Sequence, residues 1–306
     1  MTTKVAVLDD ADEIVASKYG RTEGRPVAAV QRMLREVLEM LPADAQVAGV
    51  GTTGSGRYLA GAMVGADTIK NEITAHSVAA SHYFPDTRTI LEIGGQDSKI
   101  IILRDGVVVD FAMNTVCAAG TGSFLDQQAF RLKIGIDEFG PLALQSKAPV
   151  RIAGRCTVFA ESDMIHKQQM GHSVPDILYG LCEALARNYL NNLGLGKEIL
   201  EPIVFQGGVA ANQGMIRAFQ EALKCEILVP PHHHIMGAIG AALLAHEEVG
   251  ASGKATSFRG FGVTELEFRT SSFECKGCSN RCEIVEIKAD RELLARWGGR
   301  CGKWDV

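Results

Sequence analysis

The sequence predicts an α/β protein built from two similar lobes, followed by a small cysteine-rich segment. A strand–turn–strand pattern with helices behind it occurs twice in succession, near the N-terminus and again from residue 89. This differs from the simple strand–helix alternation of a single parallel sheet. The composition then changes near residue 250, where Gly, Ser and Thr open a linker. We therefore expect one domain over residues 1–250 and a linker with a cysteine-rich appendage over residues 251–306.

The first lobe begins with two short strands around an acidic turn, and a proline then opens a segment with apolar residues at helical spacing. In order, the predicted elements are strands at 5–8 and 13–17, a helix at 26–41, a strand at 47–50, a glycine-rich turn at 51–56 and a helix at 71–84.

The second lobe opens on three β-rich runs separated by a glycine-rich turn and an Asp-Gly turn, which predicts an antiparallel meander. The predicted elements are strands at 89–93, 99–104 and 107–112, helices around 122–134, 160–170 and 174–194, a buried strand at 202–206, a helix to 223, a strand at 226–229 and a helix at 236–246.

Composition excludes several functional classes. The net charge is −5 and no long Lys/Arg run occurs, so we expect no nucleic-acid partner. No apolar run is long enough to span a bilayer, and the first ten residues do not resemble a secretion signal, so we expect a cytoplasmic protein. Its eight cysteines are then expected as thiols rather than disulfides. Cys182 and Cys225 stand in apolar patterns and are expected to be buried as small hydrophobic side chains.

Two glycine turns are candidate nucleotide contacts. In the first, Gly94 and Gly95 let backbone N–H groups approach an anion, while Gln96 and Asp97 can orient a water and a hydrated Mg²⁺. In the second, residues 207–208 follow a buried strand and precede a helix. Placed in separate lobes, the two turns together favour a nucleotide held in a cleft. Neither a Walker motif nor a G-x-G-x-x-G fingerprint occurs, which disfavours a P-loop NTPase and a Rossmann dehydrogenase.

Two cysteines occupy similar local settings. Cys117 and Cys156 each precede a predicted helix and lie among small residues. The N-terminus of a helix stabilises a thiolate through its dipole and free N–H groups. Two thiols are too few for a cubane cluster, which needs four, but a two-fold dimer would supply the missing pair. Two ordinary thiols beside turns are an equally compatible interpretation.

Four segments carry a resemblance to a known family: EIGGQDSK at 92–99, CAAGTGSFL at 117–125, CTVFAESD at 156–163 and QGGVAAN at 206–212. Together they resemble the activator ATPases of 2-hydroxyacyl-CoA dehydratases and benzoyl-CoA reductases, the BadF/BadG/BcrA/BcrD type. The resemblance spans about residues 1–250 and implies an acetate-and-sugar-kinase/Hsp70/actin-like two-lobed fold. It also implies a homodimer that bridges one [4Fe–4S] cluster, and ATP-driven transfer of one electron from a donor such as ferredoxin or flavodoxin to the dehydratase or reductase.

The resemblance also implies the site residues. Cys117 and Cys156 would ligate the cluster, and Gln96 and Asp97 would be catalytic. The residues implied to hold ATP or ADP with Mg²⁺ are Gly94, Gly95, Gln96, Asp97, Gly120, Thr121, Gly122, Gly207, Gly208 and Asn212. The family begins with a phosphate-binding hairpin, whereas this sequence starts at what should be the second strand of that hairpin. We therefore expect the first hairpin to be truncated, which leaves three interpretations of hydrolysis open: the chain is a fragment, its start is misplaced, or it binds nucleotide weakly or not at all.

The C-terminal segment departs from the small activators, because four of its cysteines have metal-site spacing: Cys275, Cys278, Cys282 and Cys301. A structural zinc ion and a second iron–sulfur cluster are both compatible with four thiols. We favour the cluster because the resemblance implies an anaerobic context. Two functional alternatives to a redox ATPase stay open: a sugar or carboxylate kinase of the same superfamily, and a non-hydrolysing cluster-bearing subunit that docks to a reductase.

Overall fold

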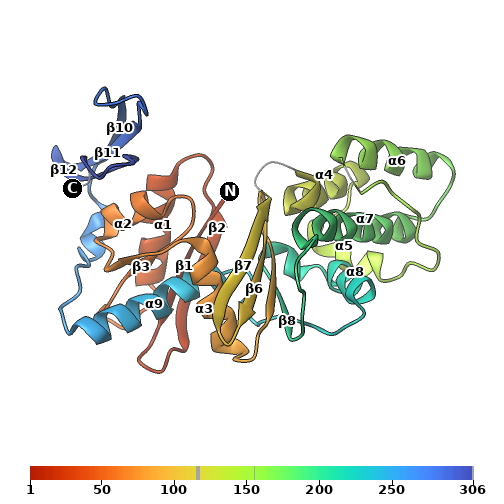
Figure 1. The fold of residues 1–306 in the computed structure, drawn as a ribbon, viewed down its shortest axis with the longest axis horizontal. Coiled ribbons are helices and arrows are strands. Elements are labelled where there is room, and N and C mark those ends of the chain that lie inside the picture. Colours follow the sequence, from red (N-terminus) through yellow and green to blue (C-terminus); the bar gives the residue numbers. More distant parts are fainter. Residues whose placement is uncertain (115–117, 155, 305–306) are drawn as a thin grey trace. The chain divides into compact units, whose positions relative to one another are not determined.

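A computed structural model of the chain describes residues 1–114, 118–154 and 156–304. The predicted cluster ligand Cys117 lies outside the described residues. The chain divides into two compact units, of which one joins Met1–Val78 to Gly237–Val306 and the other is Ala79–Met236 (Figure 1). Among the described residues, no helix is both long enough and apolar enough to cross a membrane.

The second unit is organised around a five-stranded sheet in the order β7-β6-β5-β8-β9. The predicted antiparallel meander is present, because β6 pairs antiparallel with both β5 and β7. β8 pairs parallel with β5 on the other side, and β9 extends the sheet. The strands are β5 (Thr89–Ile93), β6 (Ser98–Arg104), β7 (Val107–Asn114), β8 (Ile203–Gln206) and β9 (Ile227–Leu228).

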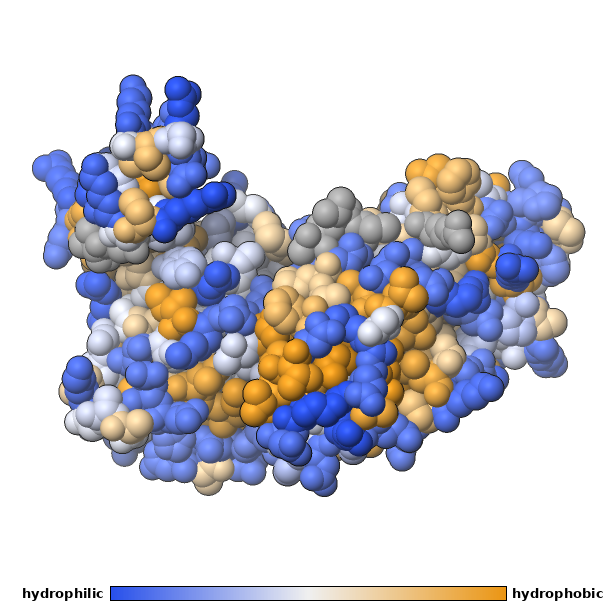
Figure 2. All heavy atoms as spheres, in the orientation of Figure 1, coloured by the Kyte–Doolittle hydropathy of each residue, from blue (hydrophilic) through white to orange (hydrophobic). Residues whose placement is uncertain are grey.

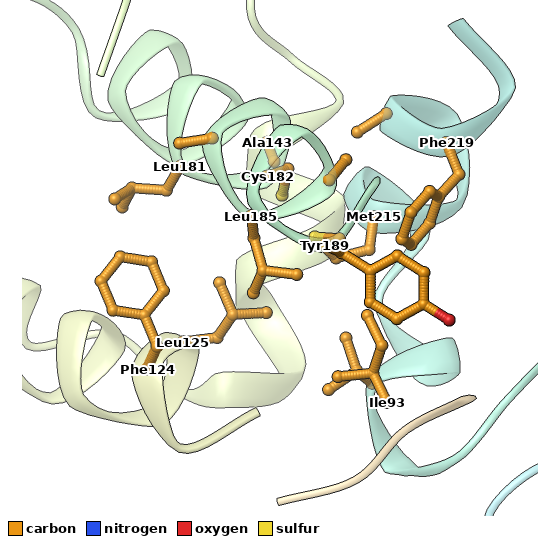
Figure 3. Close-up of a cluster of buried hydrophobic side chains, with 14 of the residues drawn as sticks. Ile93, Phe124, Leu125, Ala143, Leu181, Cys182, Leu185, Tyr189, Met215 and Phe219 are labelled. Atoms are coloured by element: carbon orange, nitrogen blue, oxygen red, sulfur yellow. The ribbon is translucent and has the colours of Figure 1, made fainter. Parts of the chain in front are cut away.

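Helices of the second unit pack around α7, which is buried along most of its length. Its side chains Leu185 and Tyr189 face Leu125 of α4, Phe219 of α8 and Ile93 at the end of β5 (Figure 3). Cys182 on α7 is fully buried, as predicted, and this burial raises the pKa of its thiol. The helices are α4 (Gly122–Leu132), α5 (Ile136–Ala143), α6 (Thr157–Gln169), α7 (Val174–Tyr189) and α8 (Gln213–Leu223), with 3-10 turns at Ala118–Gly120 and Gly208–Ala211 and a π-helical turn at Leu190–Gly194.

The first unit contains two separate two-stranded sheets, β1-β2 and β3-β4. In the second unit, β5 stands between β6 and β8 and unites the sheet, whereas no strand described in the first unit joins β1 to β3. The elements are β1 (Thr2–Leu8), β2 (Ile14–Arg21), α1 (Pro26–Leu38), β3 (Gly51–Thr52), α2 (Arg57–Val64), β4 (Thr68–Ile69), α3 (Glu72–Tyr83) and α9 (Met236–Ser252).

The C-terminal segment forms a three-stranded antiparallel sheet, in the order β10 (Phe268–Glu274), β11 (Glu283–Ala289) and β12 (Glu292–Trp297). Ile287 of this sheet joins a buried cluster with Leu34 of α1 and Met63 of α2. Gln31 of α1 donates hydrogen bonds to the carbonyls of Val263 and Leu266, at 3.1 and 3.0 Å. The segment is therefore packed into the first unit, and the boundary at residue 250 stays a prediction.

Glu286 on β11 forms hydrogen bonds and an ion pair within this sheet, and their contribution to stability can be tested. It accepts hydrogen bonds from Ser271 and Arg296 and pairs with Lys288. Interactions with Lys288, then Ser271 and Arg296, lower the pKa of Glu286 from 4.5 to about 2. Because the pKa is lower in the folded state, the stabilisation is complete above the unfolded-state pKa and is lost as the pH falls towards the folded-state value. We expect Glu286→Gln to lower Tm at about pH 7, and the difference from wild type to shrink between about pH 5 and about pH 3. Thermal unfolding followed by circular dichroism measures it, and a pH-independent difference would contradict it.

Candidate functional site

The first glycine turn joins β5 to β6. The N–H of Gly94 donates to the carbonyl of Asp97 at 2.9 Å and closes the turn. Gly95 and Gln96 are exposed, and a Cβ on Gly95 would meet no atom within 4 Å. The backbone at the tip of the turn is therefore open to a ligand, as expected of a phosphate-binding loop.

A buried ion cluster supports this turn. Lys99 Nζ lies 3.1 Å from Glu92 Oε2 and 2.7 Å from Asp97 Oδ2. The Lys99 side chain is 2% exposed and that of Asp97 is 34% exposed. Burying an ammonium is costly unless it is paired, and the two carboxylates supply that pairing. Asp97 is thereby fixed in position, and the cluster keeps one net negative charge, which suits a hydrated cation beside it.

The second glycine turn lies against the first one. Gly207 has φ of +94°, and a Cβ there would stand 2.3 Å from the Ile93 carbonyl oxygen and 3.0 Å from Glu92 Oε1. β5 and β8 are parallel neighbours, and Glu92 is paired with Gln206. Both turns therefore follow the C-terminal ends of adjacent strands, at the same end of one sheet. The expectation that they belong to separate lobes is therefore wrong, since both lie in the second unit.

Two further residues shape the second turn. The Gly207 N–H donates to the His233 carbonyl at 2.8 Å, and His233 Nδ1 lies 2.9 Å from the Gly207 carbonyl oxygen. Asn212 caps α8 by accepting a hydrogen bond from the Met215 N–H at 3.2 Å. Its buried Nδ2 has no hydrogen-bond partner among the described residues. This amide is a donor available to a ligand, and the role of Asn212 at a nucleotide stays a prediction.

The first turn is also bonded to the start of α4. The N–H groups of Gly122 and Ser123 donate to the carbonyls of Gly94 and Gly95, each at 2.8 Å. Thr121, the N-cap of α4, is buried, and its hydroxyl donates to the Ala118 carbonyl at 2.9 Å. The Gly122 N–H therefore bonds to the first turn, and the two hydrogen bonds link this turn to the start of α4.

Cys156 is the N-cap of α6 and is partly exposed. The chain just before it is held by Asn188 of α7, whose Nδ2 donates to the Gly154 carbonyl at 2.6 Å. The other amide atom of Asn188, Oδ1, lies 3.2 Å from the position of a Cβ on Gly120. This buried asparagine is thus hydrogen-bonded to the chain before Cys156 and lies close to the 3-10 turn that follows Cys117 in the sequence.

An exposed apolar surface covers the helices that follow the two cysteines; we call it the α4/α6 surface. Arg131 of α4 and Glu161 of α6 form a 2.7 Å ion pair that joins the helices. Beside them, Phe130 is 80% exposed and Phe159 is 64% exposed. Figure 2 shows apolar side chains gathered over α6. The α4/α6 surface consists of Phe130, Val158, Phe159, Ile165 and Met170.

The four C-terminal cysteines lie around one end of the β10-β11-β12 sheet. Cys275 and Cys282 directly flank the hairpin turn, and Trp304 Nε1 donates to Cys275 Sγ at 3.2 Å. Hydrogen bonds from Trp304 and from the backbone of Gly277 lower the pKa of the Cys275 thiol. Within the described ranges, however, no group of three or more His, Cys, Asp or Glu residues is arranged so that it could hold a metal ion. The metal ligands predicted in this segment therefore stay a prediction.

Comparison with known proteins is consistent over most of the chain. The model of the BadF/BadG/BcrA/BcrD ATPase family matches residues 1–245. The chain is 35% identical over 250 residues to the (R)-2-hydroxyglutaryl-CoA dehydratase activating ATPase of Acidaminococcus fermentans, covering 80% of this chain and 94% of the relative. The crystal structure of component A of that dehydratase matches with a TM-score of 0.75, over 81% of this chain and 95% of the other.

A second structure adds a nucleotide-bound relative. The activator of the 2-hydroxyisocaproyl-CoA dehydratase from Clostridium difficile, with bound ADPNP, is 32% identical with a TM-score of 0.73. The match covers 82% of this chain and 93% of that one. These likenesses confirm the fold that the sequence resemblance implies.

Proposed function

The chain belongs to the BadF/BadG/BcrA/BcrD ATPase family, and we propose that it is an ATP-dependent activator that delivers one electron through an iron–sulfur cluster. Its target would be an enzyme of the 2-hydroxyacyl-CoA dehydratase or benzoyl-CoA reductase type. One observation carries the proposal: the glycine turn after β5 is hydrogen-bonded to the start of α4, the helix that follows Cys117 in the sequence.

ATP with Mg²⁺ fits the residues around the two glycine turns. The open backbone at Gly95 would receive phosphate oxygens, and Asp97, fixed by Lys99, would hold the hydrated cation. Gln96 is exposed beside them and would orient the attacking water. The unpartnered Nδ2 of Asn212 would donate to the adenosine.

A [4Fe–4S] cluster fits a dimer better than a single chain. Cys117 and Cys156 offer two thiolates, and a second copy would complete the four that a cubane needs. The α4/α6 surface is apolar and exposed, which supports its burial against that second copy. When bound, the cluster would supply a one-electron carrier. Asn188 would help to set its position, because it is hydrogen-bonded to the chain before Cys156 and lies close to Gly120.

The coupling of nucleotide to cluster would run through backbone hydrogen bonds. A phosphate bound at residues 94–97 would shift the carbonyls that accept hydrogen bonds from Gly122 and Ser123. The first turn of α4 would move with them, and Cys117 precedes that helix in the sequence, separated from it by the 3-10 turn Ala118–Gly120. Differential contacts with ATP and ADP at one site can thus bias the arrangement of the other.

This route gives a testable variant. A Cβ on Gly122 would stand 2.9 Å from Val209 Cγ2 and 3.1 Å from the Gly94 carbonyl oxygen, so Gly122→Ala must push the turn and α4 apart. Losing a hydrogen bond of about 1 to 1.5 kcal/mol predicts about a tenfold loss in the ATP dependence of electron transfer, with a smaller change in ATP affinity. Stopped-flow reduction of the partner and nucleotide titration measure the two quantities.

A matched control is Gly262→Ala, whose Cβ would meet no atom within 4 Å. It should leave both quantities unchanged. Equal losses of affinity and of electron transfer in Gly122→Ala would contradict the coupling route.

The deciding experiment is anaerobic purification followed by three measurements on one preparation. We expect about two irons and two sulfides per chain, a dimer by light scattering, and ATP hydrolysis coupled to one-electron reduction of the partner enzyme. A cluster without ATP turnover would select the docking subunit. Phosphorylation of a sugar or carboxylate without any cluster would select the kinase and overturn the proposal.

A further inference from the structure

The hairpin of β10 and β11 brings two C-terminal cysteines together. The last paired residues are Glu274 and Glu283, and the Cys275 N–H then donates to the Cys282 carbonyl at 2.8 Å. Cys275 and Cys282 therefore continue the register as directly opposite neighbours. Side chains directly opposite on antiparallel strands have Cβ atoms about 4.5 to 5.5 Å apart.

The third strand and the chain after it return to the same end of the sheet. Trp297, the last residue of β12, pairs with Val285 near the start of β11. A Cβ on Gly298 would stand 2.3 Å from the Glu283 carbonyl oxygen, so the chain passes directly over the hairpin end. Trp304 then packs edge-to-face on Phe273 at 5.0 Å.

Cys301 is carried to this end by its neighbours in the chain. It lies between Gly298, which contacts β11, and Trp304, whose Nε1 donates to Cys275 Sγ. Cys278 lies in the hairpin turn itself, where its carbonyl accepts a hydrogen bond from Arg281 at 3.3 Å. All four cysteines thus belong to one end of one small sheet, where Cys278 and Cys301 are exposed residues.

We propose that Cys275, Cys278, Cys282 and Cys301 bind one divalent metal ion, zinc by preference, as a tetrathiolate site independent of the proposed electron-transfer function. Sulfurs about 2.3 Å from a tetrahedral zinc ion lie about 3.8 Å from one another. The directly opposite pair Cys275 and Cys282 suits that short separation, whereas a cubane spreads its ligands around four irons. Binding requires the turn at 276–281 and the segment after Gly298 to close inward by side-chain and loop rearrangement.

The site would act on the packing of the first unit. The sheet that carries it contributes Ile287 to the core beneath α1 and α2, and Trp297 stacks on Tyr58 of α2 with 6.5 Å between ring centroids. A metal that binds only the folded sheet stabilises this packing by mass action.

The test uses the full chain, purified anaerobically, with zinc, iron and sulfide measured per chain. We expect about one zinc in wild type and less than about a tenth of that in Cys278→Ser, with iron and sulfide unchanged. Cys225→Ser is the matched control, because this half-buried thiol lies in the second unit, and it should keep its zinc. Cys156→Ala should lose iron but keep zinc, so failure of the electron-transfer proposal and failure of this one give different patterns.

Wild-type protein alone provides a second measurement that does not depend on variant folding. After chelation, Co²⁺ should produce the visible bands of a tetrahedral thiolate site, and one equivalent of Zn²⁺ should abolish them. Loss of iron and sulfide in Cys278→Ser would assign a cluster to the segment and overturn the single-ion site. Octahedral Co²⁺ spectra, or equal zinc in wild type and Cys278→Ser, would overturn it as well.

Discussion

Cys156→Ala is expected to remove more than about nine-tenths of the iron and acid-labile sulfide and to reduce electron transfer to background. In the proposed dimer each substitution counts twice, so the cluster would lose two of its four thiolates. Cys156 is the N-cap of α6 and makes no side-chain capping hydrogen bond, so alanine removes the sulfur without removing a helix cap. The fold should therefore survive the change, which circular dichroism can check.

Nucleotide binding separates this effect from general damage. The glycine turns and Asn212 make no described contact with the Cys156 side chain, so Cys156→Ala should bind ATP with unchanged affinity. Cys225→Ala, which removes a thiol elsewhere in the second unit, should retain full iron and full electron transfer. Iron content equal in Cys156→Ala and wild type would rule out the bridging cluster.

Local sequence patterns were sufficient for most elements of the second unit. The β5–β6–β7 meander follows from three β-rich runs and two turns whose residues tolerate positive φ, including Asp105 at 51° and Gly106 at 75°. Helices were also predicted after Cys117 and Cys156: α4 begins at Gly122 as expected, whereas α6 begins at Thr157 rather than near residue 160. Element ends were less accurate: α9 continues through Gly250 to Ser252, well past the predicted end, and ends where Gly253 adopts a φ of +62°.

Contacts between distant segments were not predictable in this way. The parallel pairing of β5 with β8 places the two glycine turns side by side, and no local signal encodes that pairing. In the sequence, Lys99 is a polar residue at the start of an apolar strand, and its two carboxylate partners are identified only by the fold. Asn188 and His233 likewise act on backbone groups far away in the sequence. The packing of the C-terminal sheet on α1 and α2 belongs to the same class.

Gly207→Ala is expected to weaken ATP binding by about 100-fold, equivalent to about 2.8 kcal/mol. Gly207 adopts φ of +94°, where a side chain costs about 1 kcal/mol, and its Cβ would overlap the Ile93 carbonyl oxygen at 2.3 Å. The turn must therefore move away from β5. That movement breaks the two hydrogen bonds with His233, each worth about 1 kcal/mol. Isothermal titration with a non-hydrolysable ATP analogue measures the affinity.

Gly106→Ala is a control that separates the effect of backbone strain from the effect of moving the second glycine turn. Gly106 also has a positive φ, of +75°, but a Cβ there would meet no atom within 4 Å, and the residue lies in the β6–β7 turn rather than at the nucleotide site. This substitution should lower Tm only by the amount that backbone strain causes, and it should leave the affinity for ATP unchanged. If Gly207→Ala lowered Tm as Gly106→Ala does and bound ATP as wild type does, the second glycine turn would not belong to the nucleotide site. The loss of ATP affinity requires the turn to move away from Ile93. If Gly207→Ala binds ATP weakly and the control variant does not, the ligand lies where β5 and β8 end side by side.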